Sequence, residues 1–456
     1  MLPRDQSARE YVFVNRDILL CYFCLGFLLQ LPVTVMRFFL VNECNLAADG
    51  LAEVAAVLSF PWAVKPFTAF LSEQFISRFL DRNRQIAFAY FLAGLCWLSF
   101  LFFRGNLFLV LFYGFLSSFF SSFADVCQDA CLIRRINRNE TLHGRGRLQS
   151  FVLAFRAFGS LVGSFVSGGL ALLSSPFFFI AIMHLAGVIC GWRLKTLPFH
   201  RNNSNIARHR NNSDSGRSDS DSCDSGRSDS GRGDSGRGDN NRLHKTTCGV
   251  CREMCHALLY TERWLFVLTL FILALPLTDF AVLQYYFQKG QQVQPITFAI
   301  TDAVSCIFMI AASLFFNYKL KGKNWKTTIM LTQCIMMLLT ASNMLLVNRW
   351  IIVQAETYML AKAVIGSFFG QLSFMPLAVK AADLCPENYE GTFYSLYMST
   401  LNLGSVASET ITAEATRALK VNAITGEQTE TFYAFVILTN IIALFVFHTV
   451  YRKQAN

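Results

Sequence analysis

Long apolar runs constrain the fold of this chain more than any other feature. There are twelve, each of about 18 to 25 residues, which is the length that a helix needs to cross the hydrocarbon core of a bilayer. They begin near Ile18, Asp49, Gln85, Leu107, Leu148, Pro176, Trp264, Pro295, Trp325, Trp350, Gly391 and Phe432. The chain is 53% hydrophobic and only 15% charged, a composition typical of a polytopic membrane protein. We therefore predict an all-α membrane protein with twelve transmembrane helices.

A polar insert separates the first six runs from the last six. From about residue 200 to residue 247 almost no residue is apolar, and Asp-Ser-Gly-Arg occurs four times. Such a segment cannot bury enough surface to fold, so we predict a disordered linker; control through phosphorylation of its serines is the alternative. The predicted parts are an N-terminal segment, a six-helix bundle, the linker, a second six-helix bundle and a tail, at 1–17, 18–199, 200–256, 257–451 and 452–456.

Cysteines and histidines cluster at the end of the insert, at His244, Cys248, Cys251, Cys255 and His256. Zinc binding and juxtamembrane acylation are alternatives for this spacing, but nothing nearby resembles a structured zinc module, so we favour plain cysteines on an amphipathic helix. The sequence also lacks a glycine-rich phosphate loop, a Gly-x-Ser-x-Gly elbow and a His-Glu-x-x-His pair. We expect no metal, no cofactor and no enzyme activity.

Basic residues gather in alternate loops. One set contains Arg4, Arg9, Arg16, Arg78, Arg82, Arg84, Arg134, Arg135, Arg138, Arg145, Arg147, Lys319, Lys321, Lys323, Lys326, Arg452 and Lys453. The opposite set contains only Arg104, Lys289, Arg349, Arg417 and Lys420. Because basic loops stay in the cytoplasm, both termini and the insert are predicted to be cytoplasmic. This topology also explains the net charge of +10 without nucleic acid as a partner.

Ionisable residues within the apolar runs are the candidates for function. They are Arg37, Lys65, Asp125, Asp129, Arg156, Asp279, Asp302, Lys362, Glu409 and Glu414. Each costs about 2.5 to 3.5 kcal/mol at a helix centre, and water, a partner or a solute offsets that cost. Asp125 and Asp129 share one helix face, and Arg156 lies at a depth comparable to that of Asp125 in the next run.

Two explanations compete for these charges. Opposite charges on neighbouring helices can pair and hold the bundle together, and we favour this pairing, or exposure to solvent, for Asp129 and Glu414 near the ends of their runs. For Arg156, Asp125 and Asp302, which lie deeper, we favour a role with a solute. We extend the same expectation to Lys362.

Helix-breaking, small and aromatic residues add further expectations. Pro61 and Pro66 flank Lys65, so this helix should bend and free carbonyl groups around Val57 and Trp62. Small residues recur every four positions, and we expect them to permit close packing of another helix backbone. They are Gly159, Gly163 and Ser167, and later Gly366 and Gly370. The aromatic run Tyr285 to Phe287 fits stacking on a flat heterocycle and an interfacial belt equally well.

Several motifs resemble one family. FPWAVKPFTAFLSE, from Phe60 to Glu73, resembles the Pro-Trp-x-x-Lys-Pro signature of the folate-biopterin transporter family of the major facilitator superfamily. ADVCQDA, LQSFVLAFRAFGSLVGSFVSG, LPLTDFAVLQYYF and DLCPENYEGTFYSLYMSTLNLGS resemble further segments of that family in the same order. The chain departs from the pattern with Ala69 and Glu73 in place of Gly and Asp, with Arg134 where an acid is expected, and with Leu153 where Trp is expected.

This resemblance implies two six-helix bundles around a central cavity and import of folate or pterins by alternating access, coupled to protons. Folate carries carboxylates and a flat ring, so its site should offer cations and aromatic walls. The expected substrate-binding residues are Lys65, Asp125, Arg156, Asp279, Tyr285 and Lys362. The expected proton-coupling residues are Asp125, Asp129 and Asp302. The expected gating or structural motif residues are Pro61, Trp62, Pro66, Glu73, Gln149, Gly159 and Gly163.

We expect the partners to be a folate or pterin solute, protons and the lipid bilayer, with the chain acting as a monomer. The expected location is the plasma membrane, with an organellar membrane as the alternative. Two other functions remain open from the sequence. A carrier of this fold for S-adenosylmethionine or another small metabolite would bind its substrate with the intramembrane acids, and a non-transporting sensor would signal through the insert.

Overall fold

The structure is a computed structural model that describes residues 8–103, 106–139, 147–195, 260–320, 322–350, 353–386 and 390–452. Every regular element within these ranges is helical. The described residues of Met1–Thr196 and Thr261–Asn456 belong to one compact unit. The predicted linker and its cysteine and histidine cluster lie outside the described residues, so their boundaries and roles stay predictions.

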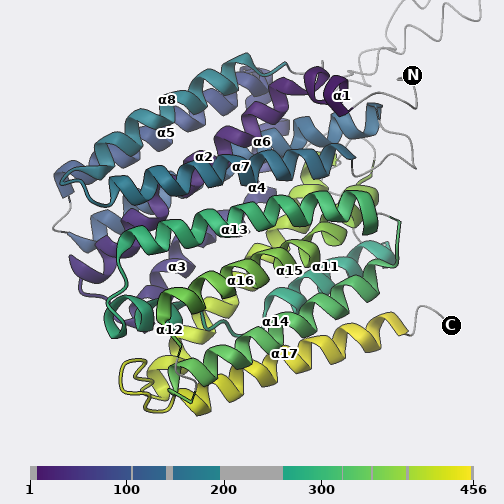
Figure 1. Ribbon diagram of the computed structural model, residues 1–456. Helices are drawn as coiled ribbons and strands as arrows, with labels where there is room; N and C mark the ends of the chain where they lie inside the picture. The colour runs from purple at the N-terminus through teal and green to yellow at the C-terminus, as the bar shows by residue number, and fades with distance from the viewer. Residues whose placement is uncertain are drawn as a thin grey trace, which may run out of the picture. The chain divides into compact units, whose positions relative to one another are not determined.

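The first half of the described chain runs from α1 to α8 (Figure 1). Its elements are α1 (Ala8–Val14), α2 (Arg16–Asn42), α3 (Ala48–Ala63), α4 (Lys65–Gln74), the 3-10 turn η1 (Ile76–Arg78), α5 (Arg82–Phe103), α6 (Leu107–Asn139), α7 (Arg147–Leu170) and α8 (Pro176–Arg193).

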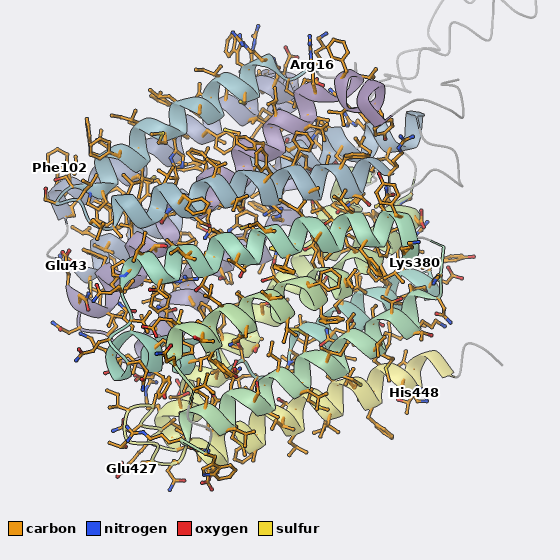
Figure 2. All side chains as sticks on the ribbon, in the orientation of Figure 1. Arg16, Glu43, Phe102, Lys380, Glu427 and His448 are labelled. Atoms are coloured by element: carbon orange, nitrogen blue, oxygen red, sulfur yellow. The ribbon has the colours of Figure 1, made fainter. Side chains whose placement is uncertain are left out.

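The second half runs from α11 to α17, which ends near the C-terminus. Its elements are α11 (Thr261–Ala274), α12 (Phe280–Tyr285), the π-helical turn η2 (Tyr286–Gly290), α13 (Pro295–Phe315), the π-helical turn η3 (Phe316–Leu320), α14 (Trp325–Val347), α15 (Ala355–Leu384), α16 (Glu390–Ala418) and α17 (Thr429–Arg452). Arg16, Lys380 and His448 mark one end of the helices, here called the basic end, and Glu43, Phe102 and Glu427 mark the other, the far end (Figure 2).

Helices occupy all twelve predicted positions, with starts displaced by at most five residues. Ten stretches of the described chain are long and apolar enough to cross a membrane by length and composition. The two other positions hold the interrupted pair α11 and α12 and the polar helix α16. The predicted all-α membrane fold is therefore confirmed, and the two less apolar positions have a common explanation.

Both positions are explained by the interruption of helical structure between α11 and α12, around Pro276. Backbone groups at such a break need partners, because lipid offers none. Ser408 and Thr412 of α16 supply two of them: the Ser408 hydroxyl donates to the carbonyl oxygen of Pro276 at 2.5 Å, and the amide of Thr278 donates to the Thr412 hydroxyl at 3.2 Å. Two of the hydroxyl groups that make α16 less apolar thus satisfy the backbone of its neighbour.

The predicted bend around Lys65 is confirmed by the break between α3 and α4 at Val64. Pro66 has no N–H with which to bond the Trp62 carbonyl, four residues earlier. The side-chain amide of Asn402 in α16 donates to this carbonyl instead, at 3.0 Å. A carbonyl freed by a proline in the first half therefore holds a residue of the second half.

Only the first of the two predicted small-residue stripes is a close helix contact. A Cβ atom at Gly159 of α7 would collide with the backbone oxygen of Phe23 in α2, and one at Gly163 would lie 2.8 Å from that of Phe27. The prediction for the second stripe was wrong: a Cβ at Gly366 would meet only the Leu339 side chain at 3.3 Å, and one at Gly370 would meet nothing within 4 Å. Small residues permit a close approach, but the neighbouring helix must also be there.

The largest contacts between the two halves are those of α7 with α13 and of α3 with α16. Figure 1 shows α7 and α13 running side by side, one from each half of the chain. Since α2 packs tightly on α7 and α15 packs on α13, these pairs bring the charged segments of both halves to a common interior.

Candidate functional site

A cavity of about 590 Å³ lies between the two halves and is here called the central cavity. Its walls come from α2, α3, α4, α6 and α7 of the first half and from α11, α13, α15 and α16 of the second. The polar and aromatic side chains that line it are Tyr22, Gln30, Trp62, Lys65, Asp125, Asp129, Gln149, Arg156, Ser160, Gln371, Phe374, Tyr394, Asn402 and Ser405. The volume falls in the range of about 300 to 1,000 Å³ that is usual for small-molecule sites.

A cluster of Lys65, Asp125 and Arg156 forms one wall of the central cavity. The Lys65 ammonium donates a hydrogen bond to Asp125 Oδ2, and both side chains are buried. Arg156 Nη1 lies 3.6 Å from Asp125 Oδ1 but makes no hydrogen bond to it, and the Arg156 side chain is 32% exposed. As expected from the sequence, an acid of α6 faces a base of α7. Lys65 of α4 joins this pair.

Asp129 lies one turn along α6 from Asp125 and also lines the central cavity. It is 7% exposed, and its Oδ1 accepts a hydrogen bond from the hydroxyl of Tyr22 at 2.5 Å. Within the described ranges no basic nitrogen lies within 4.0 Å of its carboxylate. The expectation of ion pairing or solvent exposure at this residue was therefore wrong, because α6 continues beyond it and buries it beneath α2.

Side chains of the second half complete the cavity wall and tie it to the first. The Gln149 amide of α7 donates to the hydroxyl of Tyr394 in α16 at 2.7 Å. Trp62 donates through Nε1 to Ser118 at 3.0 Å, and its ring lies 4.4 Å from the Lys65 ammonium, the geometry of a cation–π contact. The indole ring therefore contacts the ammonium of the Lys65–Asp125 ion pair.

Glu73 connects the halves at the basic end. One oxygen accepts from Arg82 at 3.0 Å and lies 4.0 Å from Arg134, and the other accepts from the Thr392 hydroxyl of α16 at 2.5 Å. Arg134, the departure from the family pattern noted above, thus lies beside Glu73 as a second cation. Pro61, Pro66, Gly159 and Gly163 act here through the bend and the helix contact already described.

A second cavity, of about 270 Å³, contains charged residues that were expected to share a site with Arg156. Arg37, Asp302 and Lys362 line it, together with the rings of Phe280, Phe287 and Phe298. Asp302 accepts from Arg37 at 2.8 Å and from Gln30 at 3.2 Å. Asp302 and Lys362 therefore do not belong to the wall of the central cavity.

Asp279 and Tyr285 line neither of these two cavities. Asp279 accepts from the Asn343 amide at 2.6 Å, and Asn343 in turn accepts from the Tyr358 hydroxyl at 2.7 Å. Tyr285 packs against an apolar cluster that includes Phe287 and Tyr433. The structure thus places two expected substrate contacts within the packing of the second half.

Eight of the polar and aromatic side chains that line the central cavity were not predicted from the sequence, among them Gln30, Tyr22, Tyr394 and Asn402. Gln30 is the one with a usable signal, because an amide in the middle of a 27-residue apolar helix has to find a partner. The two tyrosines resemble ordinary aromatic positions of an apolar run, and Asn402 lies in a helix with many polar residues.

Solved structures of other proteins share this fold. An auto-inhibited POT family peptide transporter superposes with a TM-score of 0.65 at 13% identity, covering 96% of each chain. A D-xylose-proton symporter gives a TM-score of 0.60 at 14% identity, covering 95% of this chain and 97% of its own. At these identities the likenesses show the fold, which is a helical bundle with a polar cavity between its two halves, as in these two transporters.

Sequence comparisons identify the family. Residues 25–451 match the BT1 family, and the chain belongs to it. Probable folate-biopterin transporter 2 of Arabidopsis thaliana is 24% identical over 400 residues, which cover 86% of this chain and 72% of the relative. Folate transporter 1 of Plasmodium falciparum (isolate 3D7) is 22% identical over 415 residues, which cover 90% of this chain and 74% of the relative.

Proposed function

We propose that this transporter imports folate or an unconjugated pterin through the central cavity. The names of its relatives support this substrate class, and so does the chemistry of the wall. A flat pteridine ring needs aromatic surface, which Trp62, Phe374 and Tyr394 offer. A carboxylate needs a cation with unused donors.

The proposal rests on one observation, which is the environment of Arg156. Its guanidinium is partly exposed to the cavity, and no hydrogen bond within the described part of the chain occupies its donors. Lys65 is the cation that bonds Asp125. The planar guanidinium of Arg156 therefore keeps its N–H donors for an anionic solute.

The test is uptake of labelled folate and labelled biopterin into proteoliposomes containing the full chain. Arg156→Lys keeps the charge but loses the fork, so folate uptake should fall about ten-fold, equivalent to about 1.4 kcal/mol, with normal insertion. Arg84→Lys, an arginine at the basic end that stacks on Trp192, is the matched control and should stay within two-fold of the wild type. Unchanged uptake by the Arg156 variant, or uptake of S-adenosylmethionine in place of folate and biopterin, would refute the proposal.

Alternating access is proposed from contacts at both ends of the helix pair α3/α4 and α16. At the basic end Glu73 bonds Thr392, and at the far end Arg417 pairs with Glu53 and lies 3.5 Å from Asp49. Trp62 and Asn402 join the helices between these points. A rocking motion about this middle contact would break one end at a time and open the central cavity to one side at a time.

Asp129 is our proposal for the proton-coupling carboxylate. Asp125 and Asp302 each face a cation at hydrogen-bonding distance, whereas the partner that the described residues give Asp129 is the neutral Tyr22 hydroxyl. A buried carboxylate without a cation is easily neutralised by a proton, so its state can follow solute binding to Arg156.

An imposed proton gradient tests this assignment. Asp129→Asn should abolish gradient-driven accumulation of folate while leaving exchange of folate across the membrane within about two-fold of the wild type. Asp81→Asn, in the exposed turn before α5, is the control and should keep both activities. Full accumulation by the Asp129 variant would remove this residue from the coupling step.

A further inference from the structure

The second cavity has the features of a binding site in its own right. Three phenylalanine rings, Phe280, Phe287 and Phe298, form its apolar walls, and its 270 Å³ accommodates a single small ring system more readily than a molecule as long as folate. The rings come from α12, η2 and α13, so the second half supplies most of the cavity. Arg37 of α2 is its contact with the first half.

Helix register places this cavity beyond the central one, toward the far end. Along α13, Asp302 and Ser305 line the second cavity, whereas Cys306 and Met309 line the central one. Along α2, Arg37 and Gln30 divide in the same way, seven residues apart, which is about 10 Å of helix. The two cavities are therefore consecutive compartments along the same helices.

A hydrogen-bonded partition separates them. Asp302 accepts from Gln30, which lines the central cavity, and from Arg37, which lines the second. The guanidinium carbon of Arg37 also lies 5.9 Å from the ring of Phe280 and 5.8 Å from that of Phe298. Arg37 and Asp302 thus neutralise each other and are held in place from both sides.

Lys362 leaves the second cavity with one positive charge in excess. No carboxylate oxygen of the described residues lies within 4.0 Å of its ammonium. Asp279, which acts on it electrostatically, lies outside the wall of this cavity and accepts a hydrogen bond from Asn343. An ammonium that no carboxylate of the described residues neutralises at close range, in a cavity with three aromatic rings, matches a ligand with one negative charge attached to a ring.

We propose that the second cavity is a separate binding site for a small aromatic carboxylate, whose carboxylate accepts hydrogen bonds from Lys362 and whose ring packs among Phe280, Phe287 and Phe298. Nothing in this assignment requires folate to be the transported solute, so it goes beyond the proposed function. The Gln30–Asp302–Arg37 partition keeps such a ligand out of the central cavity in this conformation.

The experiment is a fluorine NMR titration of the full chain in nanodiscs with 4-fluorobenzoate and its neutral isostere 4-fluorobenzamide. The wild type should bind the carboxylate at least ten-fold more tightly than the amide. Lys362→Met should remove this preference, whereas Lys362→Arg should retain it. Lys380→Met, on the same helix α15 but at the basic end and outside both cavities, is the matched control and should equal the wild type.

Three results would overturn the proposal. The first is equal affinity of the wild type for the two probes, or binding of neither. The second is a carboxylate preference that persists in a folded Lys362→Met protein, with folding checked by its melting temperature against Lys362→Arg. The third is loss of 4-fluorobenzoate binding in Arg156→Gln with no effect in Lys362→Met, which would put the anion in the central cavity instead.

Discussion

The two cavities contain the same kinds of side chain but balance their charges differently. In the central cavity Lys65 and Arg156 converge on Asp125, while Asp129 finds a neutral partner, the Tyr22 hydroxyl, among the described residues. In the second cavity Arg37 and Asp302 form a one-to-one pair and Lys362 stands apart. The first arrangement leaves a fork of donors and a neutralisable acid, and the second leaves a point charge. The chemistry of each cavity therefore depends on which charged side chains pair with each other, and not only on which residue types are present.

The largest expected effect comes from removing the shared acid of the central cavity. Asp125→Asn would leave Lys65 buried without a carboxylate, and breaking such a buried pair costs about 3 to 5 kcal/mol. We expect a melting temperature in detergent well below that of the wild type. Lys65→Met combined with Asp125→Asn should recover part of the loss, and a double variant no more stable than the single one would contradict this account.

The next largest effect on stability is expected from glycines of α7 and α15. Gly159→Ala places a Cβ against the backbone of α2 and should destabilise the fold by about 1 to 3 kcal/mol, whereas Gly370→Ala in α15 meets nothing within 4 Å. We expect the second change to be neutral within about 0.5 kcal/mol, since alanine also favours the helix. Melting curves of the two variants side by side measure the difference, and equal curves would show that the helix contact is looser than described.

A smaller effect is expected for the pair in the partition. Arg37 and Asp302 are each 17% exposed, so water solvates either partner when the other is removed. Asp302→Asn should therefore lower the free energy of unfolding by about 1 kcal/mol, clearly less than Asp125→Asn. A loss as large as that of Asp125→Asn would mean that the second cavity is as dry as the buried core of the first half.

The smallest effect on stability is expected at Asp129. The side-chain carbonyl of asparagine can still accept the Tyr22 hydrogen bond, and no ion pair is broken within the described residues. Asp129→Asn should therefore melt within about 0.5 kcal/mol of the wild type, because the amide keeps the hydrogen bond and removes a buried carboxylate that has no ion pair there. The melting measurement and the transport assay together distinguish a role of Asp129 in proton coupling from a role in stability. A marked loss of stability in Asp129→Asn would show that Asp129 stabilises the fold.

Much of the site was predictable from neighbouring positions on helices. Asp125 and Asp129 share a face because they are four residues apart, and Pro66 frees the Trp62 carbonyl because proline has no N–H. Gln30 and Asn402 were missed because each acts through a residue of the other half, Asp302 and Trp62 respectively. The separation of Lys362 and Asp302 from Arg156 was missed for the same reason.

The order of apolar runs, the breaks at prolines and the family motifs determined the helical membrane fold and the class of transporter, because spans and bends depend on properties that lie along one stretch of chain. Only the tertiary structure decided which charges meet. Helix crossings bring Gln30 to Asp302 across 272 positions and Glu73 to Thr392 across 319, while Gly370 faces open space despite its spacing. Such contacts depend on the angle and depth at which helices pack, which no local pattern in the sequence encodes.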